Sequence, residues 1–369
     1  MLGPLLPALI ARWHIQDAQA GTLFVASFAG QLCGAWFATY NLRASVVYGS
    51  CITAAGCAFM AWADFGTAHV ALFCIGFGLG AGLTAGNVIV GTAMPSIRTQ
   101  LLAMLNVAWG IGAITCSLLV RACGPGRVGL FFIILAICLT VAAVLALAIP
   151  TTTSEALPGV EHQNSGFLLK SSLLKRWMPL PLLPLLMFSA AMLLFVGVEN
   201  ALGGWLPSYG VRTSTAVRAS SIALCFWVAE MVGRLLLAGL TNLFGEAALY
   251  RSSVSLLLLT QAVLIFTRHP GAPEIVALTI VSGLAIAPIY PLILSFFLAR
   301  TGNHPRLGPV FAAASLGGAT LPWLTGVVST QFHGLRAGLV VPAAAVALLL
   351  LLSAGITGTP ASSGEKVFS

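Results

Sequence analysis

The chain has 369 residues, of which 59% are apolar and only 7% are charged, and its mean hydropathy is +1.00. A soluble domain of this length cannot bury so much apolar surface, so this composition excludes a soluble enzyme or binding module. The net charge of +8 comes from basic residues scattered between apolar stretches, a pattern that argues against nucleic acid as a partner.

The chain begins with an apolar stretch, residues 1–11, that has about half the length a membrane-spanning helix needs. We expect this stretch to be the outer half of a truncated first helix, because no basic leader precedes it and no small-residue cleavage site follows it, as a signal peptide would require. Eleven longer apolar stretches follow. We predict full spans at 20–40, 45–63, 69–93, 101–122, 127–149, 180–205, 217–240, 248–267, 274–298, 307–329 and 335–355.

A long polar connection divides these spans into two groups of six, if the first half-helix is counted. We expect an N-terminal helical bundle at 1–149, a cytoplasmic linker at 150–178, a C-terminal bundle at 179–356 and a cytoplasmic tail at 357–369. With the linker inside, ten basic residues lie on the cytoplasmic side and seven outside, in the direction of the positive-inside rule. The prediction is a monomeric, multi-pass protein of a bacterial plasma membrane, in contact with the lipid bilayer.

The two halves repeat one another. Glycine-rich motifs at 78–82 and 110–113 return in the same order, with similar separations, at 283–295 and 317–326. Aligning Gln31-Leu-Cys-Gly34 with Glu230-Met-Val-Gly233 places a polar residue three positions before a glycine in both halves. Internal repeats of this kind are typical of secondary transporters, so we expect Gln31 and Glu230 to occupy equivalent positions facing a central cavity.

Only two of the nine acidic residues, Glu199 and Glu230, fall inside predicted spans. A charged group in the middle of a membrane helix costs about 2.5–3.5 kcal/mol on insertion scales, so its default interpretation is functional. Both are candidates for proton coupling. Alternatively, Glu230 forms a structural ion pair with Arg234, four residues later on the same helix. We expect Glu199 to lack such a partner and to lie near the outer end of its helix, at a different depth from Glu230.

Polar and aromatic residues in the middle of spans are candidates for solute binding. Amides exchange hydrogen bonds with hydroxyl groups, and flat aromatic rings cover the C–H face of a sugar, so the set favours a polyhydroxy solute. The alternative to solute binding is, for each residue, hydrogen bonding between helices and, for Trp205, a place in the interfacial aromatic belt. We also expect Gly203-Gly204 to weaken the helix beside two of them. The candidates are Gln31, Asn87, Asn106, Trp109, Asn200, Trp205, Trp227 and Tyr290.

Metal and cofactor chemistry has no visible signal. The eight cysteines lie in or beside apolar spans without a C-x-x-C pair, and the six histidines are dispersed, so we predict no metal site. No glycine-rich phosphate loop with a lysine is present. We therefore expect no cofactor and no enzymatic activity, and an ion or solute gradient as the energy source.

Several motifs together resemble the fucose permease branch of the major facilitator superfamily. They are Gly3-Pro-Leu-Leu-Pro-Ala8, Gln19-Ala-Gly21, Gly197-Val-Glu-Asn200 followed by Trp205, the stretch Gly283–Ser295, and Gly317-Gly-Ala-Thr-Leu-Pro-Trp-Leu-Thr-Gly326. The resemblance covers essentially the whole chain and implies two pseudo-symmetric bundles of six helices. It also implies transport by alternating access, in many members with protons and a sugar. Where the fucose permease has Glu-Thr-Ala-Ala-Asn, this chain has Leu83-Thr-Ala-Gly-Asn87, which keeps the amide but lacks the acid.

We therefore expect an all-α polytopic membrane protein that acts as a secondary active transporter of a small polar solute, a sugar above all, with protons as a possible partner. Two other functions stay open. One is an exporter of amphipathic drugs or lipids, and the other is a degenerate membrane protein that transports nothing. The energetics also stay open between proton coupling through Glu199 or Glu230 and uncoupled equilibration.

Overall fold

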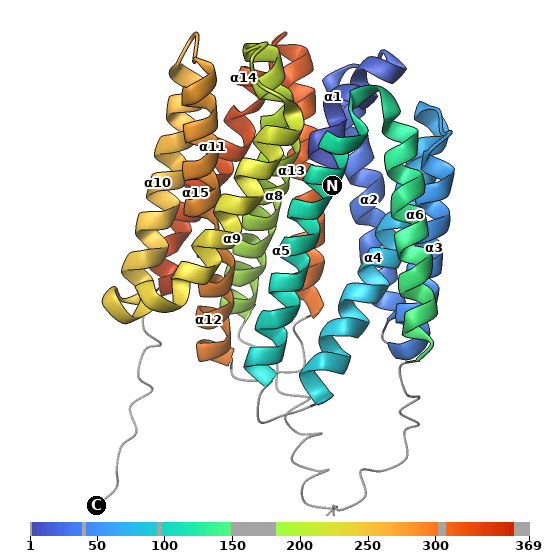
Figure 1. Ribbon diagram of the computed structural model, residues 1–369. Coiled ribbons are helices and arrows are strands. Elements are labelled where there is room, and N and C mark those ends of the chain that lie inside the picture. The colour runs from blue at the N-terminus through green and yellow to red at the C-terminus, as the bar shows by residue number, and fades with distance from the viewer. Residues whose placement is uncertain (1, 39–41, 94–97, 149–181, 302–307, 358–369) are drawn as a thin grey trace, which may run out of the picture.

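The computed structural model describes residues 2–38, 42–93, 98–148, 182–301 and 308–357. All regular structure within these ranges is helical, and the long helices run side by side along one axis (Figure 1). Nine helical segments of the described ranges are long and apolar enough to cross a membrane. The predicted all-α membrane fold is therefore confirmed. The predicted linker at 150–178 and almost all of the predicted tail lie outside the described residues.

The N-terminal half, as we call helices α1 to α6, begins with the short α1 (Leu2–Trp13). It continues with α2 (Asp17–Phe37), α3 (Leu42–Met60), α4 (Phe65–Ala93), α5 (Arg98–Cys123) and α6 (Val128–Ala146). Within this half, α4 packs along α2 and α3, and α6 packs along α3. Within α5, Val107–Cys123 forms a shorter apolar helical segment.

The C-terminal half begins with α8, the longest helix described. Its helices are α8 (Leu182–Thr213), α9 (Ala219–Leu243), α10 (Glu246–Phe266), α11 (Ala272–Ile286), α12 (Ile289–Thr301), α13 (Gly308–Gln331), α14 (Leu335–Gly338) and α15 (Val340–Thr357). Here α8 packs along α13 and α15, and α11 packs along α9 and α10. The pairs α11–α12 and α14–α15 each occupy one of the spans expected from the sequence.

Glycines allow α2 and α4 to pack backbone against backbone. A Cβ atom added at Gly30 or Gly34 of α2 would overlap a carbonyl oxygen of α4, and one added at Gly76 or Gly80 of α4 would overlap a carbonyl oxygen of α2. Each pair is spaced by four residues, so each helix offers a strip without side chains along the contact. Small residues at this spacing are the usual means of close helix packing where the hydrophobic effect gives no net attraction.

The same contact recurs in the second half and supports the internal repeat. Gly76 of α4 lies against the α2 backbone at Gln31 and one turn before it. In the same way, Gly283 of α11 lies against the α9 backbone at Glu230 and one turn before it. Gln31 and Glu230 therefore hold equivalent positions in two equivalent helix pairs. This equivalence was predicted from the alignment of the two halves.

In the described part of the chain, the two halves meet mainly where α2 packs along α13, where α5 packs along α9, and where α1 packs against α8 and α9. At the end of the molecule where α2 begins and α8 ends, which we call the Asp17 end, the contact between α2 and α13 is tight: Gly21 of α2 lies against the backbone of Trp323, and Gly326 of α13 lies against the backbone of Asp17. A polar network also joins the halves there, as described below.

Helix α8 does not break at the weak point expected from the sequence. Gly203 and Gly204 lie within an uninterrupted helix that continues to Thr213. The absence of a side chain at these two positions leaves room for the Trp227 and Phe24 rings that pack on them. The prediction of a weakened helix at this point was wrong, and the packing alternative is correct. The interruption lies instead between α11 and α12, which are separated by the two residues 287 and 288.

Candidate functional site

Three ionisable side chains meet in the interior of the C-terminal half, and we call them the buried charge cluster. Glu199 comes from the middle of α8, and Glu230 and Arg234 come from successive turns of α9. The guanidinium of Arg234 donates to Glu199 at 3.0 Å and forms an ion pair with Glu230. The side chains of Glu199, Glu230 and Arg234 are 11%, 2% and 19% exposed.

Two expectations about Glu199 were wrong. It has an ion-pair partner, Arg234, and it lies at the same depth as Glu230, because both carboxylates contact one guanidinium. The error arose from ending the predicted span at residue 205. Because α8 extends to Thr213, Glu199 lies near its middle rather than near its outer end. The expected ion pair between Glu230 and Arg234 is present, but as part of a larger cluster.

The charges in this cluster do not balance. One guanidinium faces two carboxylates, so the cluster carries a net negative charge when both acids are ionised. Apart from the ion pair of Glu230 Oε1 with Arg234, the second Glu230 oxygen and the Arg234 Nε are buried without a hydrogen-bond partner among the described residues. An uncompensated buried charge costs several kcal/mol, so the cluster is costly to bury when both acids are ionised.

A tryptophan of the N-terminal half covers the cluster. The Arg234 guanidinium carbon lies 5.4 Å from the ring centroid of Trp109, which belongs to α5. Trp109 in turn meets Trp227 of α9 edge to face, with ring centroids 5.5 Å apart. The Arg234 guanidinium therefore contacts the N-terminal half through a cation–π interaction. Trp109 is 40% exposed, so this side of the cluster is not closed off by protein.

Tyr290 lies beside the interruption between α11 and α12. It belongs to the first turn of α12, packs its ring against Phe195 of α8 at a centroid distance of 5.8 Å, and lies within electrostatic reach of Glu199 and Arg234. Interrupted helices near the middle of the membrane are frequent at solute and ion sites of secondary transporters. The structure thus brings together Glu199, Glu230, Trp109, Trp227 and Tyr290 of the predicted residues.

The other predicted residues lie apart from these contacts. The amide of Asn200 donates to the carbonyl of Val196, and the amide of exposed Asn87 donates to that of Leu83. Each bond uses one amide hydrogen and leaves the side-chain oxygen available. Gln31 is half-buried on α2. Their role in solute binding stays a prediction, as does that of Asn106, a residue of α5 whose side chain is outside the described part.

Trp205 has a structural role in this conformation. It is fully buried, and its indole N–H donates to the carbonyl of Pro322 in α13 at 2.8 Å. Its ring also packs near Phe24 of α2. Trp205 therefore does not belong to an interfacial aromatic belt, and here it contributes to the tight contact between the halves. Within the described ranges, no three His, Cys, Asp or Glu residues lie close enough to hold a metal ion.

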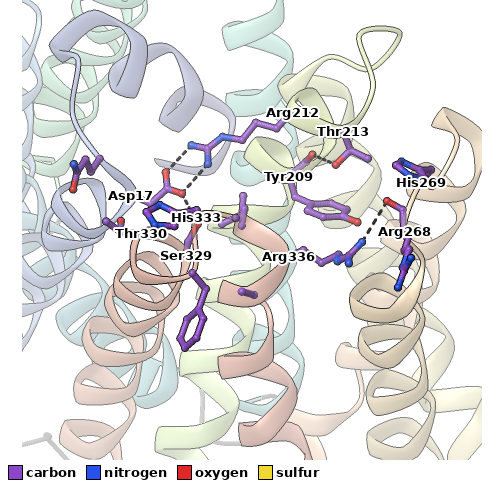
Figure 2. A pocket seen from close by; sticks show the side chains of 15 residues that line it. Asp17, Tyr209, Arg212, Thr213, Arg268, His269, Ser329, Thr330, His333 and Arg336 are labelled. Carbon is purple, nitrogen blue, oxygen red and sulfur yellow. Dashed lines mark hydrogen bonds and ion pairs between the residues drawn. The ribbon is translucent and has the colours of Figure 1, made fainter.

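A second polar network, at the Asp17 end, was not predicted from the sequence (Figure 2). Asp17, the first residue of α2, accepts two hydrogen bonds from Arg212 of α8, at 2.6 and 2.7 Å. It accepts a third from Ser329 of α13, at 2.5 Å. We call these three residues the latch, because they tie the N-terminal half to the C-terminal half. In the sequence, Asp17 lies just before the span predicted at 20–40, and only the tertiary contacts distinguish it from the other acids outside the spans.

The latch borders a pocket of about 910 Å³ that opens at the Asp17 end. The pocket lies among the starts of α2 and α14 and the ends of α8 and α13, beside the connection from α10 to α11. Its charged and titratable lining residues are Asp17, Tyr209, Arg212, Arg268, His269, His333 and Arg336. In Figure 2, Asp17 lies to the left beside Arg212, and Arg336 lies farther to the right, below Tyr209.

Comparison with solved structures identifies the fold. A nucleoside transporter matches with a TM-score of 0.75 at 13% identity, over 97% of this chain and 95% of its own. The E. coli fucose:proton symporter matches with a TM-score of 0.57 at 20% identity, over 96% and 94%. A bacterial homologue of the human lysosomal transporter Spinster matches with a TM-score of 0.70 at 14% identity, over 96% and 93%.

Sequence comparison extends this result. The chain is 26% identical, over 368 residues, to the "Bypass of stop codon protein 6" of Saccharomyces cerevisiae, covering 89% of this chain and 73% of the yeast protein. The sequence profile of the Major Facilitator Superfamily matches residues 1–306. The fold, the repeated helix pairs and this match lead to one conclusion: the chain is a multi-pass membrane protein that belongs to the major facilitator superfamily, whose members are transporters rather than enzymes.

Proposed function

We propose that this protein is a proton-coupled carrier of a small polyhydroxy solute, a sugar or sugar-like compound, and that the buried charge cluster is its proton site. The observation that carries the proposal is the sharing of one guanidinium by two buried carboxylates at the contact with α5. Membership of a superfamily of secondary transporters supplies the general mechanism, alternating access.

The cluster suits proton coupling for an electrostatic reason. With one proton bound, the two acids and Arg234 are neutral as a set, and their burial costs little. Without that proton, the set carries a negative charge that is costly in the apolar interior. Because Trp109 of the N-terminal half covers Arg234, a movement of α5 relative to α9 changes the surroundings of the cluster. Proton binding and the relative position of the halves therefore depend on each other.

Two considerations support a polyhydroxy solute. The rings beside the cluster are indoles and a phenol, which cover the apolar face of a sugar ring. Apart from the cluster, the amide oxygens of Asn87 and Asn200 accept no hydrogen bond from the described residues and suit hydroxyl groups. In addition, two structural neighbours are described as carrying a nucleoside and fucose, both of which contain a polyhydroxylated ring.

A thermal-shift screen in detergent identifies the solute first, because a ligand that binds only the folded state raises the melting temperature. Monosaccharides, disaccharides, nucleosides and common amphipathic drugs form the panel. We expect stabilisation by a sugar or nucleoside. Stabilisation by the drugs alone would refute the polyhydroxy solute and favour an exporter.

Uptake into proteoliposomes then tests the coupling. With the identified solute and an inward proton gradient, the wild type should accumulate solute above the external concentration. Glu230→Gln, which fixes the acid in a neutral form, should lose accumulation. The matched control is Glu274→Gln, because Glu274 is exposed at the start of α11 and lies outside the cluster. Accumulation by Glu230→Gln equal to that of the control would refute the assignment of the proton site.

The proposed function bears only in part on which membrane contains the protein. A carrier that uses a proton gradient belongs in an energised membrane, which agrees with the predicted plasma membrane. The prediction of a bacterial inner membrane stays a prediction, since the curated sequence relative is a yeast protein.

A further inference from the structure

The pocket at the Asp17 end combines a strong positive charge with a single acid. Three arginines and two histidines line it, against Asp17. The charge of Asp17 is already engaged by two hydrogen bonds from Arg212 and one from Ser329. Among the described residues, no carboxylate pairs with either of the other two arginines of the pocket. The pocket therefore carries uncompensated positive charge.

Arg336 contributes to this uncompensated positive charge. Its Nη1 donates to the backbone carbonyls of Thr267 and Arg268, both at 3.3 Å, which holds the side chain at the pocket (Figure 2). Backbone carbonyls position a guanidinium but do not neutralise it. Positioned guanidinium groups that lack a carboxylate partner are suited to bind carboxylate or phosphate groups, which match their planar geometry.

Arg212 belongs to both the latch and the pocket. Its side chain is 39% exposed, whereas that of Asp17 is 10% exposed, so an anion in the pocket has access to Arg212 while Asp17 remains covered. The latch is reinforced nearby by the N–H of Ala18, which donates to the hydroxyl of Thr330 in α13 at 2.9 Å. A second anion at Arg212 would therefore compete with the carboxylate that holds α2 to α8.

We propose that this pocket binds a small anion that carries a carboxylate or phosphate group, and that the anion competes with Asp17 for Arg212 and so opens the latch. The ligand binds more tightly to the open latch than to the closed one, and by thermodynamic linkage its binding shifts the protein toward the open state. The proposal goes beyond the transport function above, because it does not depend on which solute crosses the membrane.

The phosphate or carboxylate can belong to a free solute or to the headgroup of an anionic lipid. The first arm of the test is isothermal titration calorimetry in a neutral detergent, near neutral pH and at constant ionic strength. The probes are inorganic phosphate and gluconate, with glucose as the uncharged counterpart of gluconate. The second arm compares melting temperatures in nanodiscs of phosphatidylglycerol and phosphatidylcholine. Binding in either arm that requires Arg336 supports the proposal, and binding in neither arm overturns it.

Four variants separate competition from simple structural support. Arg336→Gln should weaken anion binding about tenfold or more, since a hydrogen bond to a charged group is worth about 1.5–3 kcal/mol. Arg336→Lys keeps the charge and should recover part of that loss. Asp17→Asn removes the competitor and should tighten anion binding about tenfold. Arg121→Gln, a change in the last turn of α5 and outside the pocket, should have no effect.

The sign of the Asp17→Asn effect decides the outcome. If Asp17 merely supports the fold of the pocket, its replacement weakens anion binding or leaves it unchanged, and either result overturns the competition. Hydrogen–deuterium exchange provides a second readout on the wild type. The anion should accelerate exchange of the Ala18 amide, because the contact of that amide with Thr330 opens with the latch. Slower exchange in the presence of the anion would likewise contradict the proposal.

Discussion

Arg234 is the residue on which the buried charge cluster depends, because it is the shared partner of Glu199 and Glu230. Replacing it by glutamine leaves two buried carboxylates without a counter-charge. Breaking a buried ion pair by removing one partner costs about 3–5 kcal/mol, most of it from the charge left behind. Arg234→Gln should therefore lower the melting temperature in detergent markedly.

A second substitution tests whether charge is the cause of this loss. Adding Glu230→Gln to Arg234→Gln removes one of the stranded carboxylates, so the double variant should be more stable than Arg234→Gln alone. If the double variant melts at the same temperature or lower, the destabilisation comes from lost packing against Trp109, and the electrostatic account of the cluster is wrong.

At the scale of helices, α4 provides a matched pair of glycines. A Cβ atom at Gly76 would overlap a carbonyl oxygen of α2, whereas a Cβ atom at Gly82 would meet nothing within 4 Å. A backbone atom cannot move aside as a flexible side chain can, so Gly76→Ala should destabilise the protein by about 1–3 kcal/mol through overpacking. The measurement is the melting temperature in detergent.

Gly82→Ala is the control, since it makes the same chemical change in the same helix. It should leave stability unchanged or raise it slightly, because alanine loses less conformational freedom than glycine when a helix forms. Equal melting temperatures for the two variants would show that the contact between α2 and α4 is looser than described.

At the scale of the whole molecule, sequence patterns were sufficient for the helical membrane fold and the repeated halves, because both depend on local hydrophobicity and spacing. The pair Glu230 and Arg234 was also predictable, since four residues on one helix bring two side chains together. The contact of Glu199 with Arg234 was missed because it depends on how far α8 extends and how it packs against α9. The latch was missed for a similar reason, because its residues come from three distant helices.

The most direct test of the central claim measures protons rather than solute. Proteoliposomes with a pH-sensitive dye inside receive the identified solute on the outside, without an imposed gradient. The account predicts that the solute acidifies the interior with the wild type but not with Glu230→Gln, while both proteins still exchange labelled for unlabelled solute. Acidification by Glu230→Gln at the wild-type rate, or its absence in a wild type that transports the solute, would contradict the account.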